Sequence, residues 1–345
     1  METIDLRSDF LTRPTAAMLS AAASAESSRH FGLREDPWQR RLEARVAELL
    51  GMGDALVFPT CTMANTTALM LGAAPGTRVV SQADAHVLIS EAGAGAAFGG
   101  VVMSPVEEHG AWPPLTAWER ALGDGGDAQR PPVRLCVVEN THNRSGGVPL
   151  PRADVTALVG LARGRKVGLH LDGARLFDAA CALNEPLASL AAGFDTVSIS
   201  FNKGFGAPIA AALAGSAALI DAALVVRQRL GGGIRPTGPA AAATLAGLDD
   251  FSHFAEVHGL ARRLADGLSA QEGFVVETMP LRTNMVIVRT RAPHDAPGIC
   301  ASLAARGLLA LPFDEQRIRF VVYRGVTLNQ IEHALEIVRD CLEAV

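Results

Sequence analysis

The sequence has few cysteines, and their spacing matches no disulfide or metal-binding framework. The five cysteines are scattered, and no two of them form a CxxC pair: Cys61, Cys136, Cys181, Cys300 and Cys341. An odd number at irregular spacing argues against a disulfide framework or a structural zinc site. We therefore expect no metal centre, and we expect most of these thiols to be small buried apolar groups.

The chain also lacks a basic block and a long apolar run. Its net charge is −5, so nothing indicates a nucleic-acid or anionic-membrane partner. Charged, Pro or Gly residues interrupt every apolar run before the length of about 20 residues that spans a bilayer. The N-terminus, METIDLRSDFLTRP, has no apolar signal-peptide core. These absences predict a cytoplasmic protein with no nucleic-acid or membrane partner.

The first 245 residues alternate short apolar, β-rich runs with stretches of helical periodicity. The predicted strands are 55–58, 78–80, 101–103, 135–139, 168–171, 196–200 and 209–214. Helices are predicted between the strands, including one that starts after Thr62 as its N-cap. This order is typical of an α/β domain with a mainly parallel sheet covered by helices on both faces.

The character of the chain changes near residue 245. Two predicted strands, a helix, another strand and a last helix follow. They indicate a small α+β domain over 246–345, after a large domain over 1–245. Residues 1–20 are too few to fold alone, so we expect them to pack across the small domain.

Lys203, in SFNKGFGAP, has no charged residue within five positions on either side. A lysine desolvated at a strand end has a lowered pKa and can act as an amine nucleophile, although a solvated loop lysine fits Lys203 alone equally well. Asp172, in HLDGARLF, ends an apolar strand 31 residues earlier, where a turn or N-cap residue is the alternative. Ligands of open α/β sheets bind at the carboxyl ends of strands, so we predict that both side chains share one crevice. An aldehyde cofactor with a ring nitrogen needs this amine and this acid.

Four further segments place polar groups at strand ends or in glycine-rich loops. FPTCTMANTTAL leads from a strand into a helix, which favours an anion beside Thr62. His86, in HVLISEAG, could stack on a ring or act as a base. ENTHNRSGG brings His142 and Asn143 to another strand end, and LGGGIRPTG carries Arg235. Alone, each segment also fits a packing residue, a polar turn or a flexible connector.

Together these segments resemble one family. RSDFLTRPT, TMAN, HVLISEAG, ENTHNRSGG, HLDGARLF, SFNKGFGAP and LGGGIR stand in the order and at the spacing of the low-specificity threonine aldolases. These belong to the aromatic amino acid β-eliminating lyase/threonine aldolase group of pyridoxal phosphate (PLP) enzymes. The resemblance implies PLP as cofactor and the aspartate aminotransferase-like PLP-dependent transferase fold (fold type I). It also implies a homodimer or homotetramer with active sites shared between subunits.

The resemblance implies roles at the cofactor for particular residues. Lys203 resembles the Schiff-base lysine, and Asp172 resembles the partner of the ring nitrogen. His86 resembles the histidine that stacks on the ring. Thr62 resembles a ligand of the phosphate, with Cys61 beside it in the same turn.

The resemblance also implies roles around the substrate. Ser8, Arg175 and Arg319 match the clamp on the substrate carboxylate, and Arg175 also counts among the cofactor-binding residues. His142 resembles the catalytic histidine near the substrate hydroxyl. Arg235 resembles the arginine that reaches the phosphate of the neighbouring subunit.

Three departures from the family pattern lie where the resemblance places the phosphate or the substrate. Cys61 replaces the glycine of an S-G-T turn, so a positive φ there would be costly. LREDP, 33–37, lacks the tyrosine that usually begins this segment, and VVY, 321–323, replaces Val-Thr-His. The centre formed by Lys203 and Asp172 is unaffected.

The predicted function is PLP-dependent retro-aldol cleavage of L-threonine, L-allo-threonine and related β-hydroxy-α-amino acids to glycine and an aldehyde. A β-eliminating lyase or a racemase on the same scaffold is one alternative, and a non-catalytic PLP-binding module is another. A dinucleotide oxidoreductase is disfavoured because no G-x-G-x-x-G follows the early strands.

Overall fold

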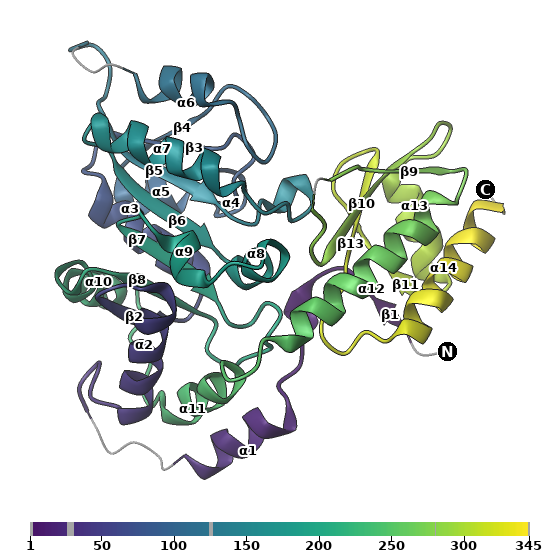
Figure 1. Cartoon of the computed structure of the whole chain (residues 1–345), viewed down its shortest axis with the longest axis horizontal. Helices are drawn as coiled ribbons and strands as arrows, with labels where there is room; N and C mark the ends of the chain where they lie inside the picture. Colours follow the sequence, from purple (N-terminus) through teal and green to yellow (C-terminus); the bar gives the residue numbers. More distant parts are fainter. Residues whose placement is uncertain (1–2, 26–30, 124–126, 280, 344–345) are drawn as a thin grey trace.

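The computed structural model describes residues 3–25, 31–123, 127–279 and 281–343. These residues form two lobes (Figure 1), a large lobe on a seven-stranded sheet and a small lobe on a four-stranded sheet. Helix α12 (Ser252–Ser269) leads from the large lobe into the small one.

The seven-stranded sheet is mainly parallel, as predicted. In spatial order its strands are β2 (Asp54–Phe58), β8 (Ala211–Gly215), β7 (Thr196–Ser200), β6 (Gly168–Gly173), β5 (Val133–Glu139), β3 (Arg78–Ser81) and β4 (Val102–Pro105). Among them, β8 alone runs opposite to the other six strands. β5 shows why the sequence predicts such strands, because its run LCVVE is buried throughout and has no polar face.

Helices connect these strands. They are α2 (Pro37–Leu50), α3 (Cys61–Gly72), α4 (His86–Ile89), α5 (Ala94–Gly99), α6 (Leu115–Leu122), α7 (Arg152–Gly164), α8 (Leu176–Leu183), α9 (Leu187–Ala191), α10 (Ala217–Arg229) and α11 (Gly238–Gly247). The carboxylate of Asp36 caps α2 by accepting from the backbone N–H groups of Trp38 and Gln39, and Gly51 ends the helix with φ 64.

Helix α3 begins two residues earlier than predicted. Thr60, not Thr62, is the N-cap, and its side chain accepts from the backbone N–H of Met63. Cys61 is the first helical residue and is not among the described residues with positive φ. The backbone penalty expected for a cysteine at this position is therefore absent, because the turn does not require a glycine conformation here.

The small lobe is an antiparallel sheet with helices against it. Its strands run in the order β12 (Leu311–Pro312), β13 (Arg317–Val321), β10 (Met285–Thr290) and β9 (Phe274–Val276). Its helices are α12, α13 (Ala296–Ala305) and α14 (Leu328–Glu343). Among the described residues, no helix combines the length and the apolar character that crossing a bilayer requires.

The N-terminal segment contacts both lobes. β1 (Ile4–Asp5) pairs in parallel with β11 (Leu308–Leu309) in the small lobe. A 3-10 turn (Asp9–Leu11) follows, and α1 (Ala16–Ser24) then packs against α11 of the large lobe (Figure 1). The predicted domain boundary at 245 falls inside α11 and stays a prediction. The segment thus ties the two lobes together beside the ends of β6 and β7.

Candidate active site

A cavity of about 260 Å³ opens where β6 and β7 end and α3 begins. Lys203 and Asp172 both line it, as predicted from their positions at neighbouring strand ends. Asp172 pairs in register with Ser198, so the two strands bring the carboxylate and the loop of Lys203 to the same edge. His86 and Thr62 line the cavity as well.

The amine of Lys203 is poised as a nucleophile. Burial, and secondarily the positive charge of Arg175, lower the pKa of Lys203 from its usual value. Its Nζ lies 5.1 Å from the ring centroid of Phe10. A lysine with a lowered pKa spends more time as the neutral amine, which is the form that attacks an aldehyde.

Asp172 is almost fully buried and held through both oxygens. Oδ2 accepts from Nδ2 of Asn65 at 2.8 Å, and Oδ1 accepts from the backbone N–H of Ala174 at 3.2 Å. The thiol of Cys61 lies 4.0 Å from Oδ1 of Asp172 and 3.6 Å from Oγ of Ser198. The Cys61 side chain therefore faces the carboxylate end of the cavity, whereas the sequence placed it in the phosphate turn. Burial, reinforced by Asp172, raises the pKa of this thiol, so it stays protonated.

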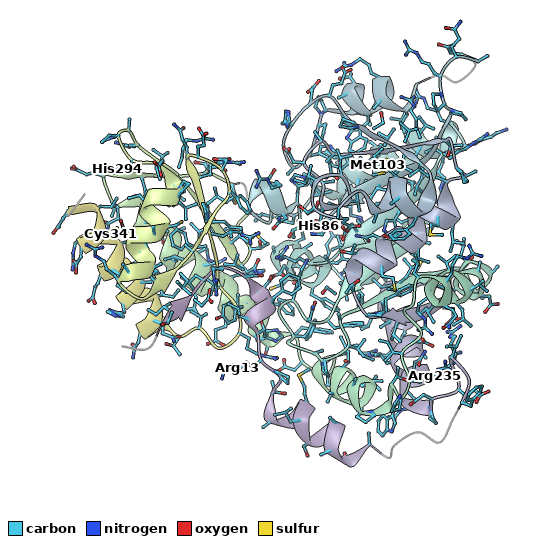
Figure 2. The ribbon with its side chains drawn as sticks, turned by 180° about the vertical axis from the view of Figure 1, so that it is seen from behind. Arg13, His86, Met103, Arg235, His294 and Cys341 are labelled. Atoms are coloured by element: carbon cyan, nitrogen blue, oxygen red, sulfur yellow. The ribbon has the colours of Figure 1, made fainter. Side chains whose placement is uncertain are left out.

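His86 begins α4 and is held on two sides. Its backbone N–H donates to Oε2 of Glu139 at 2.6 Å, and its Nδ1 lies 2.9 Å from Oε1 of Glu91. The bond to Glu91 raises the pKa of His86, and burial opposes it. Figure 2 shows His86 on the side of the large lobe that faces the small one.

His86, Glu91 and Asp172 bring ligand-type atoms within 4.8 Å of one another. The Nδ2 of Asn65 donates to both carboxylates of this group. A cation would have to displace that amide, so a hydrogen-bond network explains the cluster better than a metal site does.

The start of α3 supplies an anion-binding end to the cavity. Thr60, Cys61 and Thr62 line the cavity there, and Ser200 and Asn202 line it from the end of β7. The first N–H groups of a twelve-residue helix point out of its N-terminus and attract negative charge. The geometry fits a phosphate at this end, with Thr62 as one hydroxyl neighbour.

A buried cluster of charges between the lobes contains two predicted clamp residues. Arg175 makes a two-pronged pair with Asp9, with Nε–Oδ2 at 2.6 Å and Nη2–Oδ1 at 2.8 Å. Oδ1 of Asn143 accepts from Nη1 of Arg319 at 2.7 Å and from Nη1 of Arg175 at 3.4 Å. Ser8 stands next to Asp9 and caps the 3-10 turn by accepting from the backbone N–H of Phe10.

The charges in this cluster shift one another's pKa values. Burial alone would raise the pKa of Asp9, but Arg175, with Lys203 and Arg319 behind it, holds it at about 2. Burial and the nearby Arg175 lower the pKa of Arg319 to about 10. The Nε of Arg319 is buried and has no partner among the described residues. Two cations face one anion here, so the cluster is suited to receive a further negative group.

His142 and Arg235 are not among the described residues that line the cavity. His142 is fully buried, its Nδ1 lies 2.9 Å from Oγ of Ser145, and its Nε2 has no partner among the described residues. Arg235 donates to the carbonyl of Phe31 at 2.9 Å and lies far from His86 in Figure 2. One chain by itself therefore does not bring Arg235 to its own cavity.

Sequence reasoning missed four residues that hold the site together: Asn65, Glu91, Glu139 and Asp9. Each stands inside a motif already singled out, namely TMAN, HVLISEAG, ENTHNRSGG and RSDFLTRPT. Their presence was visible, but their partners lie far away in the chain. Asn65 and Asp172, for example, are separated by 107 residues.

The residues present fit PLP. A half-buried lysine with a lowered pKa and a buried carboxylate line one cavity, as an aldehyde and a ring nitrogen require. His86 offers a flat ring in the same cavity, and α3 offers its N-terminus to a phosphate. Lys203 would hold the aldehyde, and Asp172 would keep the ring nitrogen protonated.

Comparison with known proteins agrees with this arrangement. The sequence model described as "Beta-eliminating lyase" matches residues 5–291. Low-specificity L-threonine aldolase 1 of Arabidopsis thaliana is 36% identical over 343 residues, covering 97% of this chain and 95% of that protein. The low specificity L-threonine aldolase of Escherichia coli O157:H7 is 32% identical over 334 residues, covering 95% of this chain and 96% of that protein.

A solved structure shares the fold. The threonine aldolase of Leishmania major superposes with a TM-score of 0.81 at 19% identity, covering 98% of this chain and 99% of that one. The architecture is thus that of the fold type I PLP enzymes. With the matched family, the two relatives and a cavity suited to PLP, the chain belongs to the beta-eliminating lyase family of PLP-dependent enzymes.

Proposed function

We propose that this enzyme cleaves L-threonine, L-allo-threonine and related β-hydroxy-α-amino acids to glycine and an aldehyde. The observation that carries the proposal is that Lys203 and Asp172 line one cavity. The cationic cluster of Arg175 and Arg319 lies near it, since the charge of Arg175 lowers the pKa values of both Lys203 and Arg319. The two relatives named above as L-threonine aldolases support this choice of substrate.

When bound, PLP supplies an aldehyde that joins the amino group of the substrate and a ring that accepts the electron pair of the broken bond. Lys203 would hold the aldehyde of the cofactor. Asp172, fixed by Asn65 and the backbone of Ala174, would keep a proton on the ring nitrogen.

The arginine cluster would hold the substrate carboxylate. Arg175 and Arg319 carry two positive charges, and Asp9 balances one of them. The carboxylate of the substrate would balance the remaining positive charge. It would accept hydrogen bonds from the arginine N–H groups that now donate to Asn143, and from Nε of Arg319, which has no partner among the described residues. A fixed carboxylate turns the Cα–Cβ bond of the substrate, and this orientation supplies much of the rate enhancement.

A base must then take the proton of the β-hydroxyl group. His86 suits this role, because Glu91 engages Nδ1 and leaves Nε2 to accept a proton. His142 is the second candidate. Its unpartnered Nε2 is buried, so a small movement or a water molecule would have to connect it to the substrate.

The test is incubation of the PLP-loaded enzyme with L-threonine, L-allo-threonine and phenylserine, measuring release of aldehyde and glycine. We expect both products, and loss of turnover by at least about 10³-fold in Lys203→Ala with the fold retained. Pyruvate and ammonia would instead indicate β-elimination, and inversion at Cα would indicate a racemase. Cofactor binding without any product would indicate a binding module.

We also propose that the enzyme is a homo-oligomer with shared active sites, in the cytoplasm. Arg235 supports the first part, because it lies away from the cavity of its own chain, beside the highly exposed ring of Phe31. A partner subunit could receive this arginine at the N-terminus of its α3. The five free thiols suit a reducing compartment.

A further inference from the structure

Asn65, on α3, lies between two carboxylates in the wall of the cavity. Its Nδ2 donates to Oδ2 of Asp172 at 2.8 Å and to Oε1 of Glu91 at 2.9 Å. Its Oδ1 accepts from Oγ of Ser198 at 2.6 Å and lies 3.1 Å from Nε2 of His170. Both N–H groups and both oxygen lone pairs of the amide are therefore used.

The neighbours of this amide dictate which way it points. Ionised carboxylates only accept hydrogen bonds, so the amide nitrogen must face Asp172 and Glu91. The amide oxygen needs donors, so we expect His170 to carry its proton on Nε2, 3.1 Å from that oxygen, with its Nδ1 2.9 Å from Oγ1 of Thr196. Burial lowers the pKa of His170 to about 4, so its ring is neutral near pH 7. A neutral ring with its proton on Nδ1 would leave two acceptors facing each other.

Without the amide, the two carboxylates would face each other with little between them. Glu91 and Asp172 are both buried, and the pKa of Glu91 is raised first by burial and then also by the charge of Asp172. The other charged groups that face them are His86 and Lys203. Of these two carboxylates, the His86 ring bonds Glu91 and not Asp172, so among the described residues Asn65 is the side chain that donates to both.

We propose that Asn65 is a positioning residue that fixes the rotamer of Asp172 and holds the carboxylates of Asp172 and Glu91 in place relative to each other, with His170 holding the amide. The proposal rests on the cofactor site and not on the identity of the amino-acid substrate. Its tests can therefore be run without substrate.

The first test is ¹⁵N NMR of the histidine rings in the cofactor-free protein, with His170→Gln to assign the signal. We expect His170 to keep its proton on Nε2 and to stay neutral from about pH 5 to about pH 9. A ring that protonates near the usual pKa of about 6.5, or that carries its proton on Nδ1, would overturn the proposal.

The second test compares Asn65→Ala and Asn65→Asp with Thr67→Val as the matched control. Thr67 lies on the same helix, is fully buried, and its hydroxyl has no partner among the described residues. The readouts are the dissociation constant of PLP and the pH titration of the visible absorption of the bound cofactor.

We expect Asn65→Ala to weaken PLP binding about tenfold and to move the midpoint of the titration, because Asp172 loses its side-chain donor. Asn65→Asp should bind PLP worse than Asn65→Ala near pH 8 and recover towards pH 6, since a third carboxylate can be relieved by protonation. Thr67→Val should stay within about twofold of the wild type.

Binding and titration within about twofold of the wild type in both Asn65 variants would refute the positioning role. If neither variant folds, the NMR result decides. Failure of threonine cleavage alone would leave this proposal intact.

Discussion

At the scale of single residues, the pair of Asp9 and Arg175 shows how a buried charge is stabilised. Asp9 is fully buried, and its pKa is depressed to about 2, below the value of about 3.9 that an unfolded chain would give it. A depressed pKa contributes stability above about pH 4, and this contribution is lost as the pH falls towards about 2. Asp9, which orients Arg175, is therefore also one reason why the folded protein loses stability in acid.

Replacing Asp9 tests this account. We expect Asp9→Asn to lower the free energy of unfolding by about 3 kcal/mol near pH 7, because Arg175 would be left buried without its counter-ion. The difference from the wild type should shrink as the pH falls below about 4. Urea unfolding at several pH values measures it. Asp5→Asn, which breaks the exposed pair of Asp5 and Arg7, is the control and should cost less than about 1 kcal/mol. A pH-independent loss in Asp9→Asn would contradict the ionic explanation.

At the scale of elements, helix α12 couples the two lobes. Its first turn places Phe254 in the core of the large lobe, whereas Val257 and the later apolar positions lie in the core of the small lobe. Directly after Val257, Nε2 of His258 lies 2.9 Å from Oδ1 of Asp178 on α8, and both side chains are buried. This buried polar pair holds α12 against α8 of the large lobe.

Breaking this pair should destabilise the protein more than breaking a surface pair on the same helix. We expect His258→Leu to cost about 3 kcal/mol in unfolding free energy, because the carboxylate of Asp178 stays buried without the imidazole. Arg263→Ala removes an exposed pair with Glu332 and should cost less than about 1 kcal/mol. Thermal and urea unfolding of both variants provide the comparison. Equal effects of the two substitutions would show that the buried pair has no special role.

At the scale of the whole molecule, the position of Arg235 predicts that activity depends on the assembly. If each site takes Lys203 from one subunit and Arg235 from its partner, Lys203→Ala and Arg235→Ala should complement each other. A mixed dimer would carry one site with both changes and one site with neither. After subunit exchange, an equal mixture should regain about one quarter of the wild-type activity. A mixture no more active than its better parent would mean that the sites are not shared in this way.

Much of the fold followed from local signals. The run LCVV is apolar, and it lies with Glu139 in a buried strand in the interior of the sheet, as such a run predicts. The N-cap of α3 was misplaced by two residues, because Thr60 and Thr62 are both good caps and only the geometry of the turn chooses between them. The direction of the Cys61 side chain, towards Asp172 and Ser198, was not visible in the sequence, since a motif gives a position in the chain and not the direction of a side chain.

The sequence by itself determined the mainly parallel sheet and the chemical groups at its strand ends, because strand burial and caps depend on neighbours in the chain. It placed Lys203 and Asp172 in one cavity, since adjacent parallel strands end at the same edge. Only the tertiary structure decided that Asn65 joins Asp172 to Glu91 and that Asp9 pairs with Arg175, because 107 and 166 residues separate Asp172 and Arg175 from these partners. Such contacts depend on how helices, strands and the N-terminal segment pack in three dimensions, and no local pattern encodes them.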